Sequence, residues 1–199
     1  AAPQDPQTLV IMPGSRPAEL RRHLPVLREA IPQILKKYPN LEIKIPVART
    51  LNVSDIADAL PPSPALSILP HTDALPLLAS ASLCAVASGT ASTEAMLMGT
   101  PAVVFYKVSP PTYTLLKHLI RVPWIAMPNI LANRPILQEL IQNEFTPERL
   151  VSSLSHLLSH PHLRAQLHQH LLQLASTLEA PSPFAQTVAE HIDAITSPS

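Results

Sequence analysis

Short apolar runs rich in β-branched residues alternate with longer segments of helical periodicity along most of this 199-residue chain. The runs are almost entirely apolar, which is typical of strands buried on both faces of a parallel sheet. Alternation of such strands with helices predicts an α/β fold, and right-handed crossovers favour a doubly wound, Rossmann-like parallel sheet. Strands are expected at residues 8–12, 41–47, 66–69, 83–87, 102–106 and 124–127.

The helical segment over residues 17–37 is the clearest of those between the strands. Apolar residues recur there at the spacing of one helix face, and they are Leu20, Leu24, Leu27, Ile31 and Ile34. Pro25 and Pro32 fall inside the segment. Because proline lacks an N–H for the helix ladder, we expect these two to kink or break the helix. Further helices are expected at 54–60, 73–81, 90–98, 111–121, 135–142, 147–158, 162–178 and 183–195.

The order of elements divides the chain into three parts. Residues 1–7 start without an initiator methionine and are expected to be a linker or a truncated start. Residues 8–145 are expected to form the Rossmann-like domain, and residues 146–199 are expected to form a helical C-terminal segment. Residues 74–93 carry no charged side chain and are as long as a membrane span, which needs about 20 apolar residues. A proline, a glycine and several Ser and Thr interrupt them, so we place them in the buried part of the sheet.

The composition narrows the classes of partner. With 14 basic and 14 acidic residues, and no run of Lys or Arg, the chain has no field that would attract nucleic acid. Apolar residues make up 46% of the chain, which is enough for a sizeable core. Cys84, the only cysteine, cannot form an internal disulfide. It lies in an expected strand and is predicted to be a small buried hydrophobe in a reducing compartment.

Only three glycines occur in the chain, and two of them directly follow expected strands. Gly14 lies in Met-Pro-Gly-Ser-Arg and Gly89 in Ala-Ser-Gly-Thr-Ala, whereas Gly99 ends the helix after Gly89. A glycine turn that opens a helix at the carboxyl end of a parallel strand leaves amides free to bind an anion such as a diphosphate. Tight-turn geometry alone would also require glycine, and position does not separate the two interpretations.

Glu94 is the only charged side chain between Asp73 and Lys107. A carboxylate in so apolar a region needs partners, because its burial alone is costly. One interpretation is a cap on the helix that begins near Thr90. The other is a hydrogen bond from the paired hydroxyls of a ribose, and the adjacent glycine turn favours it.

Arg16 follows Gly14 and Ser15 at the other glycine turn. Its guanidinium can bind a diphosphate through two nitrogens while Ser15 and the turn amides hold further oxygens. The alternative is an ordinary surface arginine, although a positive charge at a helix start is mildly unfavourable.

Polar residues also follow the last expected strand, where Asn129, Asn133 and Arg134 offer hydrogen bonds or serve as turn residues. The nine histidines lack Cys or Asp at the spacing of a metal site. No Walker loop, CxxC pair, G-x-G-x-x-G motif or Ser-His-Asp order is present either. We therefore expect no metal and no cofactor.

Taken in order, these motifs resemble the C-terminal half of the lipid-A-disaccharide synthase family of GT-B glycosyltransferases. The resemblance covers residues 8–160 and departs from the family pattern at Asn133, usually glycine, and at Pro135, usually glutamate. The matching motifs are residues 12–16 with Glu19, residues 87–91 with Glu94 and 96–97, Tyr-Lys-Val-Ser-Pro at 106–110, Pro-Asn-Ile-Leu-Ala at 128–132, and Gln-Glu-Leu-Ile-Gln at 138–142.

The resemblance implies that residues 8–145 are a UDP-sugar-binding domain. The whole family enzyme transfers 2,3-diacylglucosamine from UDP to 2,3-diacylglucosamine 1-phosphate in lipid A biosynthesis and releases UDP. The site residues that the resemblance implies are Gly14, Ser15 and Arg16 beside the diphosphate, Ser88, Gly89 and Thr90 against it, Glu94 at the ribose, and Asn129 in the cleft.

The same resemblance implies that an N-terminal GT-B half carries the acceptor site and the general base. This chain alone is then expected to bind UDP without catalysing transfer. The resemblance also implies a cytoplasmic protein, at the inner face of the cytoplasmic membrane where acylated substrates lie. Whether the protein forms a homodimer is left undecided by the sequence. An interfacial surface near Lys107, Lys117 and Arg121 is one interpretation, and a core helix with a polar edge is the other. Its apolar residues are Tyr113, Leu115, Leu116, Leu119, Ile120 and Trp124.

Other functions fit parts of the pattern. The Ser-Gly-Thr-Ala turn is shared with other sugar-nucleotide enzymes, so a peptidoglycan glycosyltransferase or a UDP-sugar epimerase is an alternative. A stand-alone module that binds UDP or docks on lipid is an alternative from a different class.

Overall fold

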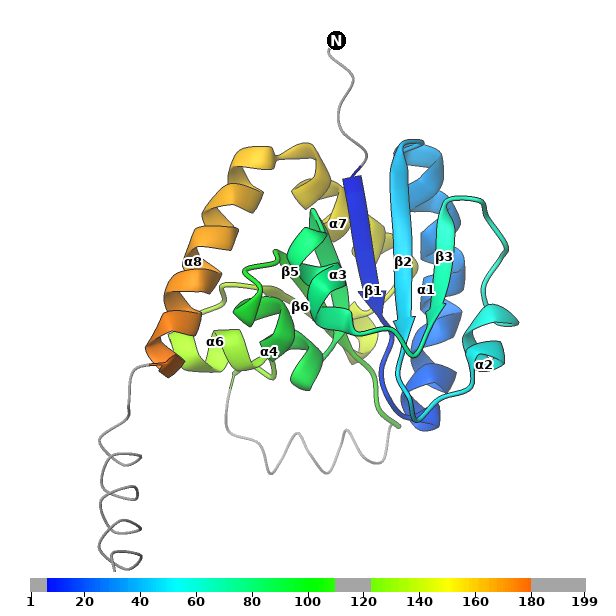
Figure 1. Ribbon diagram of the computed structural model, residues 1–199, viewed down its shortest axis with the longest axis horizontal. Helices are drawn as coiled ribbons and strands as arrows, with labels where there is room; N and C mark the ends of the chain where they lie inside the picture. The colour runs from blue at the N-terminus through cyan, green and yellow to red at the C-terminus, as the bar shows by residue number, and fades with distance from the viewer. Residues whose placement is uncertain (1–6, 110–122, 180–199) are drawn as a thin grey trace, which may run out of the picture.

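A six-stranded parallel sheet forms the centre of the computed structural model, which describes residues 7–109 and 123–179 (Figure 1). The strand order is β3-β2-β1-β4-β5-β6, so the chain leaves the central strand β1 first to one side and then to the other. This is the order of a doubly wound Rossmann-like sheet, and the predicted fold class is confirmed. The strands are β1 (Gln7–Met12), β2 (Leu41–Val47), β3 (Leu66–Pro70), β4 (Leu83–Ala87), β5 (Ala102–Tyr106) and β6 (Gln138–Ile141).

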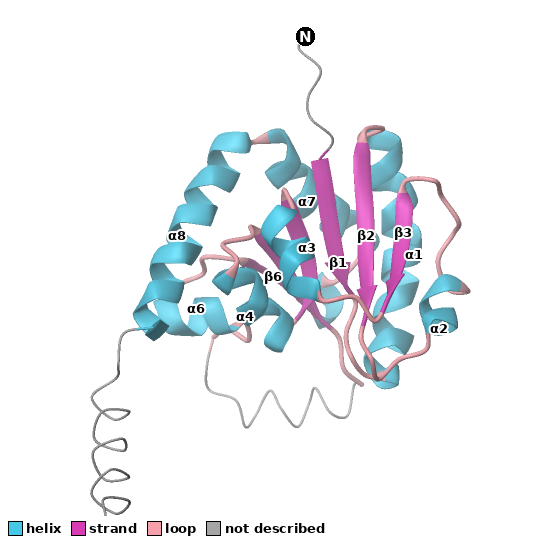
Figure 2. Ribbon diagram, in the orientation of Figure 1, coloured by secondary structure: helices cyan, strands magenta, loops and turns pink. Residues whose placement is uncertain are grey.

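Helices cover both faces of the sheet (Figure 2). Successive side chains of a strand point to opposite faces, so Leu9 and Ile11 of β1 belong to one core and Val10 to the other. The first core packs against α1 and α7, and the second against α3, α4 and α8. The helices are α1 (Pro17–Lys37), α2 (Val53–Ala57), α3 (Ala74–Ser80), α4 (Thr90–Leu97), α6 (Met127–Ala132), α7 (Pro147–Ser159) and α8 (Pro161–Glu179).

The helix α1 runs unbroken through Pro25 and Pro32, so the expected break is wrong. Both prolines are exposed. The carbonyls that lose a partner, four residues before each proline, belong to the exposed Arg21 and Arg28 and can be satisfied by water. The opposite face of α1 is buried against the sheet and holds the helix together.

Two expectations near the end of the sheet are also wrong. Residues 124–127 form no strand, and a strand, β6, lies within residues 135–142, where a helix was expected. β6 pairs in parallel with β5, with Val103 opposite Gln138 and Phe105 opposite Leu140. A run of four residues fits either structure locally, so the open edge of β5 decides the outcome. A short 3₁₀ helix, η1 (Gln142–Glu144), follows β6. The helices expected at 111–121 and 183–195 lie outside the described residues.

Candidate functional site

A cavity of about 620 Å³ opens at the carboxyl ends of the strands. Figure 2 shows β1 and β2 pointing to this edge of the sheet. It is also the point at which the chain order reverses between β1 and β4, where doubly wound sheets bind ligands. Its lining comes from all five strands β1 to β5 or the segments after them: Met12, Gly14, Ser15, Arg16, Glu19, Pro46, Val47, Ala48, Thr72, Ala74, Ala87, Ser88, Gly89, Thr90, Ala91, Glu94 and Tyr106.

Seven of the eight predicted site residues line this one cavity. They come from two glycine turns more than 70 positions apart in the chain, which the parallel pairing of β1 with β4 brings side by side. The seven are Gly14, Ser15, Arg16, Ser88, Gly89, Thr90 and Glu94.

The turn after β1 is organised by Glu19, in the first turn of α1. The Ser15 N–H donates to Glu19 Oε2 at 2.9 Å. This amide is therefore already occupied, whereas we expected it to be free for a ligand. A Cβ on Gly14, whose φ is +129°, would lie 2.5 Å from the same oxygen, which explains the glycine. Arg16 Nη1 lies 4.0 Å from Glu19 Oε1, and its side chain, which is 77% exposed, is part of the cavity lining. The role of Glu19 was missed, although an acid in a first helical turn is a known capping signal.

In the turn after β4, the Ser88 N–H donates to the Phe105 carbonyl at 2.9 Å, but the amides at the start of α4 stay free. Gly89 has φ +142° and ψ −146°, a conformation that glycine alone adopts readily, and nothing lies within 4 Å of where a Cβ would stand. The amides of Thr90 and Ala91 open α4 and find no side-chain or loop acceptor in the described part of the chain. Free amides and the helix dipole together favour an anion at this position. The Ser88 hydroxyl instead donates to the Ile125 carbonyl at 3.1 Å.

Glu94 lies on the first turns of α4 with its side chain partly buried. Among residues 7–109 and 123–179 its carboxylate has no hydrogen bond or ion pair, so the capping interpretation is not met. Burial, and then the nearby negative charge of Asp73, raise the pKa of Glu94. Glu94 also lines an adjoining cavity of about 330 Å³ with Asp73. A partly buried acceptor without a partner is available to donor groups of a ligand.

Asn129 does not line the cavity, contrary to expectation. It is fully buried on α6, where its Nδ2 donates to the Leu137 carbonyl and to Glu139 Oε1, each at 2.8 Å. Its Oδ1 accepts from the Leu137 N–H at 2.8 Å. These bonds tie α6 to the start of β6. Asn133 ends α6 in the left-handed conformation with φ 50°, which asparagine tolerates better than most residues.

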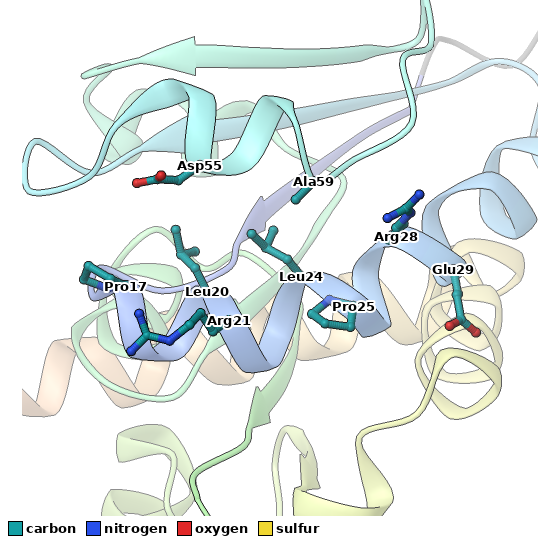
Figure 3. Close-up of a pocket in the computed structure, with 9 residues that line it drawn as sticks. All are labelled: Pro17, Leu20, Arg21, Leu24, Pro25, Arg28, Glu29, Asp55 and Ala59. Carbon is teal, nitrogen blue, oxygen red and sulfur yellow. The ribbon is translucent and has the colours of Figure 1, made fainter.

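A second cavity, of about 610 Å³, lies between α1 and α2 and holds none of the predicted residues (Figure 3). Leu20 and Leu24 of α1 point across it toward the segment that carries Asp55 and Ala59, with Arg21 and Arg28 also in the lining. No turn after a strand reaches it. We therefore place the candidate site in the cavity at the strand ends, hereafter the strand-end cavity.

In the described ranges, no group of three or more His, Cys, Asp or Glu side chains is placed to hold a metal ion. Nor does any helix there have the length and apolar character needed to cross a membrane. Of the surface suggested for lipid contact, residues 113–121 lie outside the described part, whereas Lys107 and Trp124 are partly buried.

A protein-family model described as LpxB, lipid-A-disaccharide synthetase, matches residues 1–187. The chain belongs to this family. Lipid-A-disaccharide synthase of Acinetobacter baylyi is 34% identical over 172 residues, which cover 81% of this chain and 43% of that protein. The same-named protein of Blochmanniella floridana is 38% identical over 153 residues, which cover 76% of this chain and 40% of that protein. The chain thus spans less than half the length of these members of the lipid-A-disaccharide synthetase family.

Solved structures share the fold at low identity. The calicheamicin glycosyltransferase CalG4 matches 98% of this chain and 44% of its own, with a TM-score of 0.61 and 16% identity. UDP-GlcNAc 2-epimerase from Neisseria meningitidis, bound to UDP-GlcNAc, matches 94% of this chain and 44% of its own, with a TM-score of 0.60 and 16% identity. These likenesses concern the fold alone.

Proposed function

We propose that this chain is the donor-binding half of a lipid A glycosyltransferase and that it binds the UDP of its donor in the strand-end cavity. The observation that carries the proposal is the meeting of both glycine turns in this cavity, in a member of the lipid-A-disaccharide synthetase family. The epimerase with a similar fold is described as bound to UDP-GlcNAc, which supports a UDP-sugar as the ligand class.

Two sources of positive potential face the diphosphate in this proposal. Arg16 comes from the turn after β1, and the amides of Thr90 and Ala91 come from the start of α4. The carboxylates of Glu19 and Glu94 line the same cavity, so the arginine is needed to offset them. The Glu94 carboxylate then accepts hydrogen bonds from the ribose hydroxyls. These hydroxyls are the partners that it lacks within the described chain.

The reaction follows from the chemistry of the leaving group. A hydroxyl of 2,3-diacylglucosamine 1-phosphate attacks the anomeric carbon of UDP-2,3-diacylglucosamine, the bond from that carbon to the diphosphate oxygen breaks, and UDP leaves. Arg16 and the α4 amides stabilise the charge that develops on the departing diphosphate. We place the general base and the acceptor site in an N-terminal half, so the chain alone binds UDP without transfer. We also propose a cytoplasmic location at the inner membrane face, where acylated substrates lie.

Glu94→Gln tests the ribose role directly. The amide keeps the shape of the side chain but replaces a charged acceptor, so UDP affinity should fall by about 1.5–3 kcal/mol. Isothermal titration calorimetry with UDP, in the presence of EDTA, measures the change. Glu42→Gln is the matched control, because Glu42 is exposed on β2 and lies outside the cavity.

A UDP analogue with a 2′,3′-dideoxyribose completes the test. The wild type should bind the analogue more weakly than UDP, whereas Glu94→Gln should barely distinguish them. Equal discrimination by both proteins would remove Glu94 from the site. Loss of all UDP binding on addition of EDTA would reveal a metal requirement and contradict the proposed mode of binding.

A further inference from the structure

His23, on the buried face of α1, forms hydrogen bonds through both ring nitrogens. Its side chain is fully buried. Nδ1 lies 2.7 Å from the Pro13 carbonyl oxygen, and the Lys107 backbone N–H lies 3.0 Å from Nε2. A carbonyl can only accept and a backbone N–H can only donate. Both bonds therefore require the neutral imidazole with its proton on Nδ1.

The two partners belong to segments that no strand pairing connects. Pro13 precedes Gly14 after β1, and Lys107 follows Tyr106 at the end of β5, with β4 between these strands in the sheet. Gly14 and Tyr106 both line the strand-end cavity. His23 thus links two walls of the cavity from beneath, without lining it.

Aromatic side chains hold the imidazole in place. The imidazole plane lies nearly perpendicular to the rings of Phe105 and Phe145, at centroid distances of 5.2 and 5.7 Å, and these two rings stack on each other at 4.5 Å. Gln142 secures the next residue of the same loop, because it accepts from the Val108 N–H at 2.8 Å and donates back to the Val108 carbonyl. The loop after β5 is therefore anchored at two successive residues.

We propose that His23 is a positioning residue of the strand-end cavity, whose neutral imidazole sets the separation of the β1 turn and the end of β5 for a nucleoside diphosphate. The inference rests on the proposed UDP site. Burial lowers the pKa of His23, which keeps the ring neutral at neutral pH. The charged groups that act on it are Glu19 and Arg22 of α1, and they oppose each other. Protonation would place an Nε2–H against the Lys107 N–H and break that bond.

Three substitutions separate the two hydrogen bonds. His23→Asn keeps a donor near the position of Nδ1, His23→Gln keeps an acceptor near the position of Nε2, and His23→Leu keeps neither. The matched control is Leu27→Ala, one turn further along the same buried face, which damages the same core without touching either hydrogen bond. UDP affinity is measured by calorimetry and corrected for the folded fraction. Nitrogen NMR of the ring and hydrogen exchange of the Lys107 amide are measured without nucleotide.

For His23→Leu we expect about tenfold weaker UDP binding and faster exchange at Lys107, with Asn and Gln intermediate. Leu27→Ala should lower the melting temperature and leave UDP affinity unchanged. Unchanged UDP affinity in folded His23 variants, or a proton on Nε2 in the wild type, would overturn the inference. If His23→Leu does not fold, the Asn and Gln variants decide the matter in the same way. If the wild type binds no UDP, the proposed function itself is refuted. If the wild type binds UDP and the variants bind it equally well, only the role of His23 is refuted.

Discussion

At the scale of single residues, the two glycine turns look alike in sequence but need glycine for different reasons. Gly14 leaves room for the Glu19 carboxylate, which occupies the Ser15 amide. Gly89 has open space in front of it and needs glycine only for its backbone conformation. The turn after β4 therefore presents free amides to a ligand, whereas the turn after β1 presents mainly the Arg16 side chain.

His23 should make stability depend on pH. Burial lowers its pKa in the folded protein, whereas the unfolded chain has the ordinary value of about 6.5. Above that value both states are neutral, so the full contribution to stability is present. As pH falls through it, the unfolded chain takes up a proton first, and the free energy of unfolding decreases by at most about 1.4 kcal/mol per pH unit. The decrease ends once the folded protein is also protonated.

Urea unfolding from about pH 8 to about pH 5 measures this effect. His23→Gln is the comparison, because it removes the titrating group and leaves the other histidines in place. The difference in unfolding free energy between the two proteins should narrow as pH falls. A difference that is constant across the range would show that His23 has the same pKa in both states.

At the scale of elements, α6 and β6 depend on each other. Asn129 on α6 satisfies both backbone groups of Leu137, and Glu139 on β6 accepts from the N–H groups of Ile125 and Ala126 at 3.0 and 2.9 Å. Ser88 reaches the same segment through the Ile125 carbonyl. This network couples β6, at the edge of the sheet, to the turn after β4, because Glu139 and Ser88 both form hydrogen bonds with the backbone just before α6.

Asn129→Ala should therefore destabilise the fold without removing a ligand contact. It deletes three hydrogen bonds and leaves buried polar groups of Leu137 unsatisfied, at a cost of about 2–4 kcal/mol in unfolding free energy. UDP affinity per folded molecule should stay the same. Asn133→Gly is the control on the same helix, because glycine also adopts the left-handed conformation there, and stability should change by less than about 0.5 kcal/mol. Weaker UDP binding by a folded Asn129→Ala protein would return Asn129 to the site.

At the scale of the whole molecule, the sheet separates two cores, and β4 lies near its middle. Cys84 on β4 has Val10 of β1 on one side and Ala102 of β5 on the other. It is fully buried, and burial raises the pKa of its thiol, which suppresses the reactive thiolate. The Cys84 side chain belongs to the core that α3, α4 and α8 cover, so access to this thiol requires that helical layer to open.

Labelling of Cys84 should thus report global unfolding. Reaction with a disulfide reagent should be slow in native buffer and should accelerate with urea in parallel with the loss of circular dichroism. Saturating UDP should slow it further by stabilising the folded state. Immediate stoichiometric labelling of the folded protein would show that this helical layer opens locally.

Local pattern alone determined the strands β1, β2, β4 and β5 and the two glycine turns, because near-continuous apolar runs and positive-φ glycines carry their own conformational preference. The alternation of strands and helices then implied a parallel sheet, in which both glycine turns lie at the same edge. This inference located most residues of the candidate site. The strand β6 has no such local signal, and only the free edge of β5 makes it a strand.

Tertiary structure alone decided what the polar groups do. Ser88 and Asn129 are residue types that often contact ligands. In this fold, however, each side chain forms hydrogen bonds with a neighbouring segment instead. His23 lies at helical spacing on the apolar face of α1, so its burial was predictable, but its partner Lys107 is 84 positions away. A hydrogen bond between distant segments depends on how the layers pack, and no periodicity within one segment encodes its partner.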